Sequence, residues 1–182
     1  MLKEKLKKYN IILASGSPRR QQFFKDLDLD FEIRLKEIEE IYPTELKANA
    51  FEGELKPNEI LITSDTIVWH KNKALGKPKN AEEAFAMIKS MSNTTHEVIT
   101  SVCFKTEATS TLLHDITKVT FNKLSDEAIL YYIDNYQPYD KAGAYGIQEW
   151  FGFTAVAKVE GSYTNVMGLP TAKVYEYLST LV

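Results

Sequence analysis

Segments with the pattern of a strand alternate along this chain with segments that have the pattern of a helix, and this alternation limits the folds available to it. Ile60–Trp69 is rich in β-branched residues. Residues 97–105 and 112–121 look like two further strands joined by a short connection. Helix patterns follow the capping residues Asn80 and Ser125. This order predicts an α/β fold in which flanking helices cover a mixed, twisted sheet.

Shorter patterns predict the remaining elements. Tyr9–Ser15 is expected to form a buried strand, and Ser17 is expected to cap the helix that follows it. Residues 154–159 are predicted to form a strand, and Pro170 to open a C-terminal helix. The basic segment Met1–Lys8 is interpreted as a solvated lead-in to the first strand. In the helix over 126–135, the residues expected to face the core are Ile129, Leu130 and Ile133.

Length and composition exclude several classes of protein. With 182 residues, of which 44% are hydrophobic, the chain can bury a core and is predicted to form a single domain over residues 1–182. A net charge of −3 without a basic stripe argues against a nucleic-acid partner. No apolar run approaches the ~20 residues that cross a bilayer. Ile11–Ala14 is too short for a signal peptide, so we expect no membrane contact and a cytoplasmic location. The single cysteine, Cys103, excludes an internal disulfide and a cysteine-built zinc site.

The sequence Ser15-Gly-Ser-Pro-Arg-Arg20 breaks a rule of helix composition. Arg19 and Arg20 fall in the first turn of the predicted helix, where the helix dipole disfavours positive charge. An anion at the helix end would explain them, because backbone N–H groups, the hydroxyls of Ser15 and Ser17 and a guanidinium fork together form a phosphate cradle. Two solvated arginines after a well-capped turn explain the same pattern. The spacing alone leaves both interpretations open.

Asp65 is an acid in the middle of a β-prone, apolar run. Burial of its carboxylate requires a metal, a cation or a structural hydrogen bond. Lys77, just beyond the following turn, could supply the cation, and an Asp that caps a neighbouring turn is the simpler alternative. The acidic run Glu37–Glu40 is an ordinary solvated segment unless it faces Asp65. In that case two carboxylates could hold Mg²⁺ beside a triphosphate.

Two segments in the second half of the chain are rich in small residues. Asp140–Gln148 contains glycines and alanines that allow a close approach of backbone, together with polar residues such as Lys141. Tight packing against a strand would explain the glycines but not the polar series. Gly161–Pro170 is interpreted as a loop that ends where a helix starts. The tyrosines interpreted as core and rim, rather than as a stacking platform, are Tyr131, Tyr132 and Tyr136.

Taken in order, these segments resemble the Maf family of nucleoside-triphosphate pyrophosphatases. Any one of the matching blocks is weakly specific, but together they follow the family's order and spacing over nearly the whole chain. The blocks are Leu13–Arg20, Ser64–Val68, Gly76–Pro78, Thr95–Val98, Asp140–Gln148 and Gly161–Pro170.

The resemblance implies a fold, an activity and a cofactor. The fold would be Maf/Ham1 (ITPase)-like α/β, with two lobes around a cleft. The activity would be hydrolysis of a nucleoside triphosphate to the monophosphate and pyrophosphate, by metal-assisted attack of water on the α-phosphate. The metal would be Mg²⁺ or Mn²⁺. The partner would be the nucleotide substrate, with a homodimer left open.

The resemblance also implies roles for individual residues. Asp65 corresponds to the family's general base or metal organiser, and it would hold the metal together with Glu40. Lys77 corresponds to a further catalytic residue of the family. The triphosphate would lie along the turn that opens the first helix, and the phosphate-binding residues there would be Ser15, Ser17, Arg19 and Arg20.

Residues that distinguish subgroups of the family point to pyrimidine nucleotides. The combination of Arg19, Thr66 and Gln148 looks like that of the subgroup that prefers dTTP and UTP. Gln148, Thr66 and the backbone near Gly146 would read the pyrimidine edge.

The chain departs from the family pattern at Thr44–Ala50, which is shorter than the corresponding helix of the family. Either part of that helix is lost, or a segment is missing from the sequence. The departure concerns Lys47, which matches a phosphate-site lysine of the family. An alternative function is a nucleotide-binding regulator of cell division without significant catalysis, which would use the same cradle but release no pyrophosphate.

Overall fold

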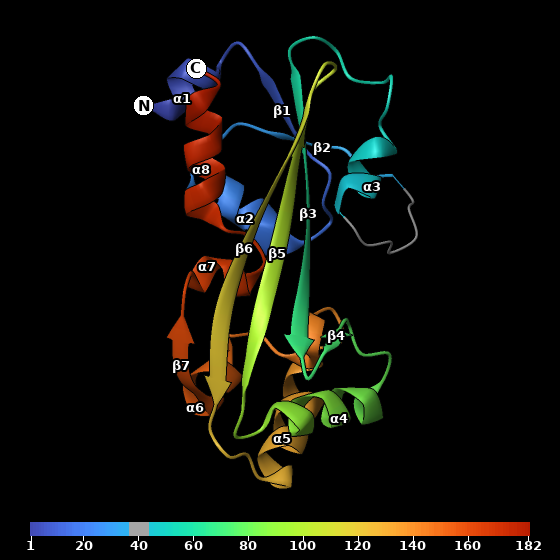
Figure 1. Ribbon diagram of the computed structural model, residues 1–182, viewed down its shortest axis with the longest axis vertical. Helices are drawn as coiled ribbons and strands as arrows, with labels where there is room; N and C mark the ends of the chain where they lie inside the picture. The colour runs from blue at the N-terminus through green and yellow to red at the C-terminus, as the bar shows by residue number, and fades with distance from the viewer. Residues whose placement is uncertain (37–43) are drawn as a thin grey trace. The chain divides into compact units, whose positions relative to one another are not determined.

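The computed structural model describes residues 1–36 and 44–182 and divides them into two compact units. Three long strands contribute residues to both units: β3 (Glu59–His70), β5 (Thr95–Lys105) and β6 (Ser110–Phe121) (Figure 1). Unit 1 comprises Met1–Asp65, Thr100–Asp115 and Gly168–Val182, and unit 2 comprises Thr66–Ile99 and Ile116–Met167.

Unit 1 is a sheet whose two faces are covered by different helices. Its own strands are β1 (Asn10–Leu13) and β2 (Glu32–Ile33), and its helices are α1 (Leu2–Leu6), α2 (Pro18–Asp26), α3 (Thr44–Asn49) and α8 (Thr171–Thr180). Strand β1 pairs in parallel with both β2 and β3. Ile11 and Leu13 pack with residues of α1, α2 and α8, whereas Ile12 packs with α3 (Figure 1). Burial on both faces explains the continuous apolar run of β1.

Unit 2 packs its helices around one core cluster that includes Val68, Ile88, Tyr132, Tyr145 and Phe151. These residues come from distant parts of the chain, so the cluster ties the segments of unit 2 together. The elements of unit 2 are β4 (Lys73–Leu75), α4 (Ala81–Met91), α5 (Asp126–Tyr136), the 3₁₀ turn η1 (Ala142–Ala144), α6 (Trp150–Ala155), β7 (Val156–Glu160) and α7 (Tyr163–Met167).

The strands form a mixed sheet, as the sequence predicts. They are hydrogen-bonded in the order β2-β1-β3-β5-β6-β7, with β4 paired to β3. Strand β1 is parallel to its neighbours, while β4 and β7 are antiparallel to theirs. Within residues 1–36 and 44–182, no helix has both the length and the apolar character needed to cross a bilayer.

The structure corrects the predicted N-terminal lead-in. Residues 2–6 form α1, and Leu2 and Leu6, one helical turn apart, are buried in the core of unit 1. Lys3, which is part-exposed, and Lys5, which is exposed, lie between these two leucines in the sequence. Their charges are the reason why the pattern predicts a solvated segment.

The structure also corrects three predictions in unit 2. Leu130 is 50% exposed, and the position that α5 buries in its place is Tyr132. Residues 154 and 155 end the unpredicted helix α6, so the strand starts at Val156. The segment expected to be a loop before Pro170 contains α7. The interpretation of the three tyrosines as core and rim is confirmed, since Tyr132 is fully buried while Tyr131 and Tyr136 are partly exposed.

A buried carboxylate anchors the start of β3. Glu59 is 2% exposed, and both of its oxygens accept hydrogen bonds from Arg34, at 3.0 and 3.3 Å. The backbone N–H of Lys56 donates to the same carboxylate at 3.0 Å. The Arg34 guanidinium is the main cause that lowers the pKa of Glu59 to about 2.

We expect Glu59→Gln to lower the free energy of unfolding at pH 7 by about 1–3 kcal/mol, because Arg34 loses a charged partner. The native carboxylate is stabilising above its unfolded pKa, and that stability is lost as the pH falls through the folded value near 2. The difference between the variant and the wild type should therefore shrink between pH 4.5 and 2 in urea titrations. Glu32→Gln is the control, since Glu32 contacts the same arginine but is exposed. Equal effects of the two variants would contradict the assignment.

Candidate active site

The predicted site residues fall into two groups that belong to different units, and each group is described by itself. Unit 2 holds Thr66, Lys77 and Gln148. Glu40 lies outside the residues that the structure describes. The predicted residues of unit 1 are Ser15, Ser17, Arg19, Arg20, Lys47 and Asp65.

The turn before α2 is built as the sequence predicts. Ser17 caps the helix by accepting a hydrogen bond from the backbone N–H of Arg20 at 3.5 Å, and Pro18 takes the first helical position. The hydroxyl of Ser15, which is buried, accepts from the N–H of Ser17 at 3.2 Å. Both serine hydroxyls thus take part in shaping the turn.

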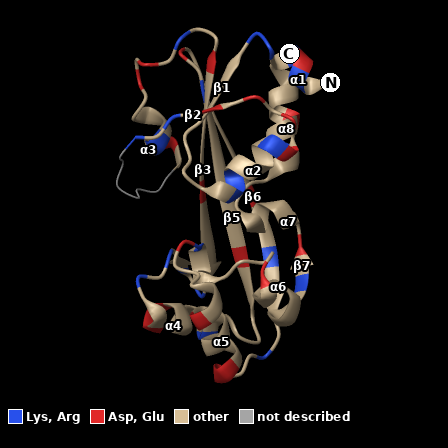
Figure 2. Ribbon diagram, turned by 180° about the vertical axis from the view of Figure 1, so that it is seen from behind, with Lys and Arg blue, Asp and Glu red and all other residues tan. Residues whose placement is uncertain are grey.

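Arg20 is anchored rather than solvated. Its Nε donates to the carbonyl oxygen of Gly168 at 2.8 Å, within unit 1. This contact holds the guanidinium while it keeps its positive charge at the start of the helix. Figure 2 shows basic residues on α2 and on α3, the two helices of unit 1 that carry Arg19, Arg20 and Lys47.

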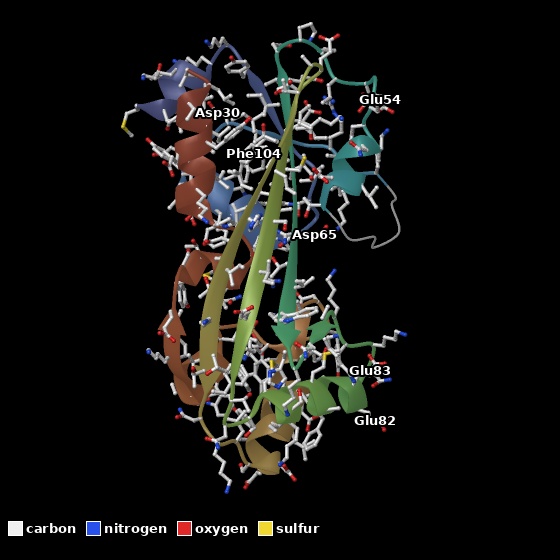
Figure 3. The ribbon with its side chains drawn as sticks, in the orientation of Figure 1. Asp30, Glu54, Asp65, Glu82, Glu83 and Phe104 are labelled. Atoms are coloured by element: carbon white, nitrogen blue, oxygen red, sulfur yellow. The ribbon has the colours of Figure 1, made fainter. Side chains whose placement is uncertain are left out.

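Asp65 lies within β3 (Figure 3), and α3 supplies a cation to it. Lys47 Nζ donates to Oδ1 of Asp65, and the Asp65 side chain is 12% exposed. Its other oxygen, Oδ2, is buried and has no hydrogen-bond partner among the described residues. Of the three partners expected for a buried Asp65, a metal, a cation or a structural hydrogen bond, the structure shows a cation, and it is Lys47. The sequence had suggested Lys77 for that place.

Two further buried oxygens near the same elements lack a hydrogen-bond partner among residues 1–36 and 44–182: Ser64 Oγ and Thr44 Oγ1. Thr44 begins α3, and its carbonyl accepts a hydrogen bond from Thr63 of β3 at 3.1 Å. Buried polar atoms without partners cost about 1–3 kcal/mol each, so such atoms indicate a ligand or ordered water. The sequence assigns no role to Thr44 or Ser64, although Ser64 opens one of the matching blocks. Their signal is position, since Thr44 begins α3 and Ser64 precedes Asp65 in β3.

The donor chemistry around Asp65 suits a divalent cation. Mg²⁺ and Mn²⁺ prefer carboxylate and other oxygen ligands, and Oδ2 of Asp65 is such an oxygen. The described part of the chain contains no cluster of three or more His, Cys, Asp or Glu side chains that could hold a metal. A site at Asp65 would therefore also need ligands from the substrate, from water or from Glu40.

In unit 2, backbone contacts join two of the predicted blocks. The carbonyl of Gly76, next to Lys77, accepts a hydrogen bond from the N–H of Gly143 at 3.0 Å. Gly143 has a φ of 68°, and a Cβ there would lie 2.8 Å from Cγ2 of Val68. Close packing against β3 thus requires glycine at position 143. Gln148 is half-buried and lies in a turn closed by the hydrogen bond from Glu149 N–H to the Gly146 carbonyl, 3.2 Å long.

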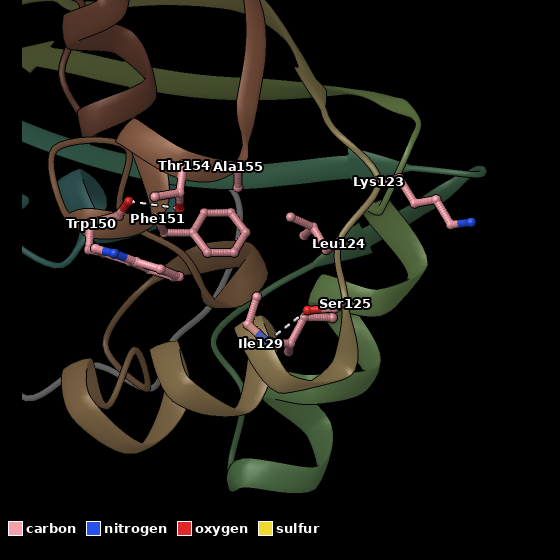
Figure 4. Close-up of a pocket in the computed structure, with 9 residues that line it drawn as sticks. Lys123, Leu124, Ser125, Ile129, Trp150, Phe151, Thr154 and Ala155 are labelled. Carbon is pink, nitrogen blue, oxygen red and sulfur yellow. Dashed lines mark hydrogen bonds between the residues drawn. The ribbon is translucent and has the colours of Figure 1, made fainter.

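A separate pocket of about 320 Å³ lies in unit 2 (Figure 4). Its lining includes Ser125, Trp150, Phe151 and Thr154. None of the predicted site residues that the structure describes is part of this lining. Among the described residues, the wall contains a single cation, Lys123, and two aromatic side chains, Trp150 and Phe151, a set that does not match the charge of a triphosphate.

Comparison with known proteins places the chain in a family. The family model described as "Maf-like protein" matches residues 10–181. The dTTP/UTP pyrophosphatase of Flavobacterium johnsoniae is 82% identical over the full length of both chains, and that of Flavobacterium psychrophilum is 62% identical over 98% of this chain and 97% of its own. The alignment with the former spans 194 positions, so this relative carries residues that the chain of 182 residues lacks.

A solved structure supports the same fold. The Ham1 protein of Staphylococcus aureus matches with a TM-score of 0.56 and 14% identity, over 95% of this chain and 100% of its own. An identity of 14% supports a conclusion about the fold alone. The structural match confirms the predicted Ham1-like α/β architecture. With the family match over nearly its whole length and full-length relatives at high identity, this chain belongs to the Maf-like protein family.

Proposed function

We propose that this protein hydrolyses nucleoside triphosphates, with dTTP and UTP preferred, to the monophosphate and pyrophosphate. The names of the relatives at 82% and 62% identity, both dTTP/UTP pyrophosphatase, support the activity and the substrates. The observation on this chain that carries the proposal is the Asp65 carboxylate. One of its oxygens is held by Lys47, and the other is buried with no hydrogen-bond partner among the described residues.

In the proposed reaction, water attacks the α-phosphorus and the bond to the oxygen that bridges the α- and β-phosphorus atoms breaks. Pyrophosphate leaves with that oxygen, and the proton of the water is taken up by Oδ2 of Asp65 and passed to solvent. Lys47 holds Oδ1, which orients the carboxylate so that Oδ2 is available to the water. A divalent cation bound by Asp65 and Glu40 would neutralise phosphate charge and polarise the phosphoryl oxygens.

Positive groups would bind the triphosphate. The N-terminus of α2 supplies backbone N–H groups, and Arg19 and Arg20 supply guanidinium groups beside them. The anchoring of Arg20 on Gly168 supports this role, because a held guanidinium loses little freedom when it binds a phosphate. Lys77 is proposed as a further neutralising cation.

Three residues are proposed to set the base preference. Gln148 carries an amide that can pair with the edge of a pyrimidine, and Arg19 and Thr66 complete the combination that resembles the dTTP/UTP subgroup. Backbone groups in the middle of the turn over 146–149 would add directional hydrogen bonds, since the N–H of Gly146 is already bonded to Tyr132.

The experiment that tests this function is pyrophosphate release by the purified protein with Mg²⁺ or Mn²⁺, across dTTP, UTP, CTP, GTP and ATP. Release concentrated on dTTP and UTP, with the monophosphate as co-product, is the expected result. Pyrophosphate release mainly from a triphosphate with another base would support the proposed reaction and overturn the assignment of the base. Binding of dTTP without any release would instead favour the nucleotide-binding regulator.

We also propose that residues 1–182 act as one Maf-like domain in the cytoplasm. Strands β3, β5 and β6 each contribute residues to both units, which supports one cooperative structure. A single unfolding transition, followed by circular dichroism and by tryptophan fluorescence, is expected. Two separate transitions would contradict the single domain.

A further inference from the structure

The hydroxyl of Tyr132 is hydrogen-bonded on two sides. Tyr132 lies on α5 and has no exposed surface. Its hydroxyl accepts a hydrogen bond from the backbone N–H of Gly146 at 2.9 Å and donates one to Oε2 of Glu149. Burial, and the bond to Glu149, raise the pKa of Tyr132, so the hydroxyl keeps its proton at neutral pH. One side chain of α5 therefore holds two positions of another segment.

Those two positions are the ends of a tight turn. The N–H of Glu149 donates to the carbonyl of Gly146 at 3.2 Å, which closes a four-residue turn. Its central residues are Ile147, which is buried, and Gln148, which is half-buried. Because both ends contact the same hydroxyl, the turn cannot change its orientation without breaking a hydrogen bond of Tyr132.

Lys141 completes this network. Its Nζ lies 3.0 Å from Oε1 of Glu149 and 2.8 Å from Oδ1 of Asp140, and its side chain is only 10% exposed. A carboxylate held by a lysine on one oxygen and by a tyrosine on the other has little orientational freedom. Gly146 leaves the space for it, since a Cβ there would lie 2.8 Å from Cδ of Glu149.

We propose that Tyr132 and Glu149 are positioning residues that set the base selectivity of the turn that carries Gln148. This rests on the proposed function, in which Gln148 and the backbone near Gly146 read the base. Uracil and thymine present a carbonyl acceptor where cytosine presents an amino donor. The N–H groups of Gly146 and Glu149 are already used within the turn, so the backbone donor that would read the base is that of Ile147 or Gln148. A backbone N–H always donates and never accepts, so a turn held in one orientation distinguishes these bases. A turn released from Tyr132 accommodates both.

The test compares Tyr132→Phe with the wild type on UTP and CTP. The variant keeps the ring and its packing but leaves the N–H of Gly146 and Oε2 of Glu149 without their shared partner. We expect the ratio of kcat/KM for UTP to kcat/KM for CTP to fall at least about tenfold. The change should lie mainly in the KM for UTP, with kcat altered by less than about threefold, because the reacting groups are untouched.

Tyr145→Phe is the matched control. Tyr145 is also a buried tyrosine of unit 2, but its hydroxyl is hydrogen-bonded to Nε2 of His96 at 2.8 Å rather than to the turn over 146–149. Both variants lose one buried hydroxyl, so their thermal stabilities should fall by similar amounts. Only Tyr132→Phe should change the ratio, and an equal change in both variants would overturn the proposal.

Two variants at Glu149 keep the test decisive if Tyr132→Phe fails to fold. Glu149→Gln retains an oxygen that can accept from Tyr132, so its selectivity should stay closer to the wild type than that of Glu149→Ala. Calorimetric Kd values for UTP and CTP are measured alongside turnover. If the wild type binds UTP more tightly than CTP but releases no pyrophosphate, the proposed catalysis is contradicted. The positioning role is then tested by the ratio of the two Kd values in the variants. Variants with the wild-type ratio, or a wild type without any preference, would overturn the positioning role.

Discussion

Asp65→Asn should lower kcat for pyrophosphate release by about 10³-fold or more, while the Kd of the nucleotide changes by less than about threefold. Asn has the size of Asp, so β3 can keep its backbone and its packing. Its amide cannot take up the proton of the attacking water, and it removes the negative charge that faces Lys47. Steady-state pyrophosphate release and calorimetric binding separate the two effects.

Glu54→Gln is the matched control for this variant. Glu54 also pairs with a lysine, Lys36, in unit 1, but its side chain is 53% exposed and lies outside the predicted site (Figure 3). Loss of an exposed ion pair changes stability by about 1 kcal/mol or less and should leave turnover unchanged. A near-normal rate for Asp65→Asn would contradict the role of Asp65 as the general base.

Gly152→Ala should have the largest effect on stability, with a loss of about 3 kcal/mol or more in the free energy of unfolding. A Cβ at position 152 would lie 1.7 Å from the carbonyl oxygen of Ile147 and 2.5 Å from its carbonyl carbon. Both are backbone atoms, so no side-chain rotation can relieve the overlap. The addition of one methyl group must therefore push α6 away from the turn over 146–149. Urea unfolding followed by circular dichroism measures the loss.

Gly76→Ala is the control for Gly152→Ala, because a Cβ at position 76 would meet no atom within 4 Å. It adds the same methyl group in the same unit, and we expect a change in stability within about 0.5 kcal/mol. A Gly152→Ala protein as stable as the Gly76→Ala protein would show that the close approach of α6 to Ile147 does not exist in solution.

Local rules were sufficient for several elements. The turn before α2 is one case, where Ser17 and Pro18 occupy the cap and the first helical position as predicted. Helix α4 is another, with Asn80 accepting from the N–H of Glu83. Caps and apolar periodicity act over a few residues, so they can be recognised without knowledge of the rest of the fold.

The face of α5 shows where local rules fail. Leu130 is the more hydrophobic residue, yet α5 buries Tyr132, which lies three residues after the buried Ile129. A buried tyrosine needs partners for its hydroxyl. Those partners, Gly146 and Glu149, lie 14 and 17 residues further along the chain, and the pattern of the helix does not predict them.

The sequence by itself determined the types of most elements and the order of the chemical groups, because both depend on near neighbours. It also marked Asp65, since a carboxylate is out of place in an apolar strand. Only the tertiary structure decided that Lys47, 18 residues away, holds Oδ1 and that Oδ2 stays buried without a partner among the described residues. The physical reason is that a hydrogen bond or ion pair forms only when the backbone brings two groups within about 3–4 Å, and that depends on the packing of the whole unit.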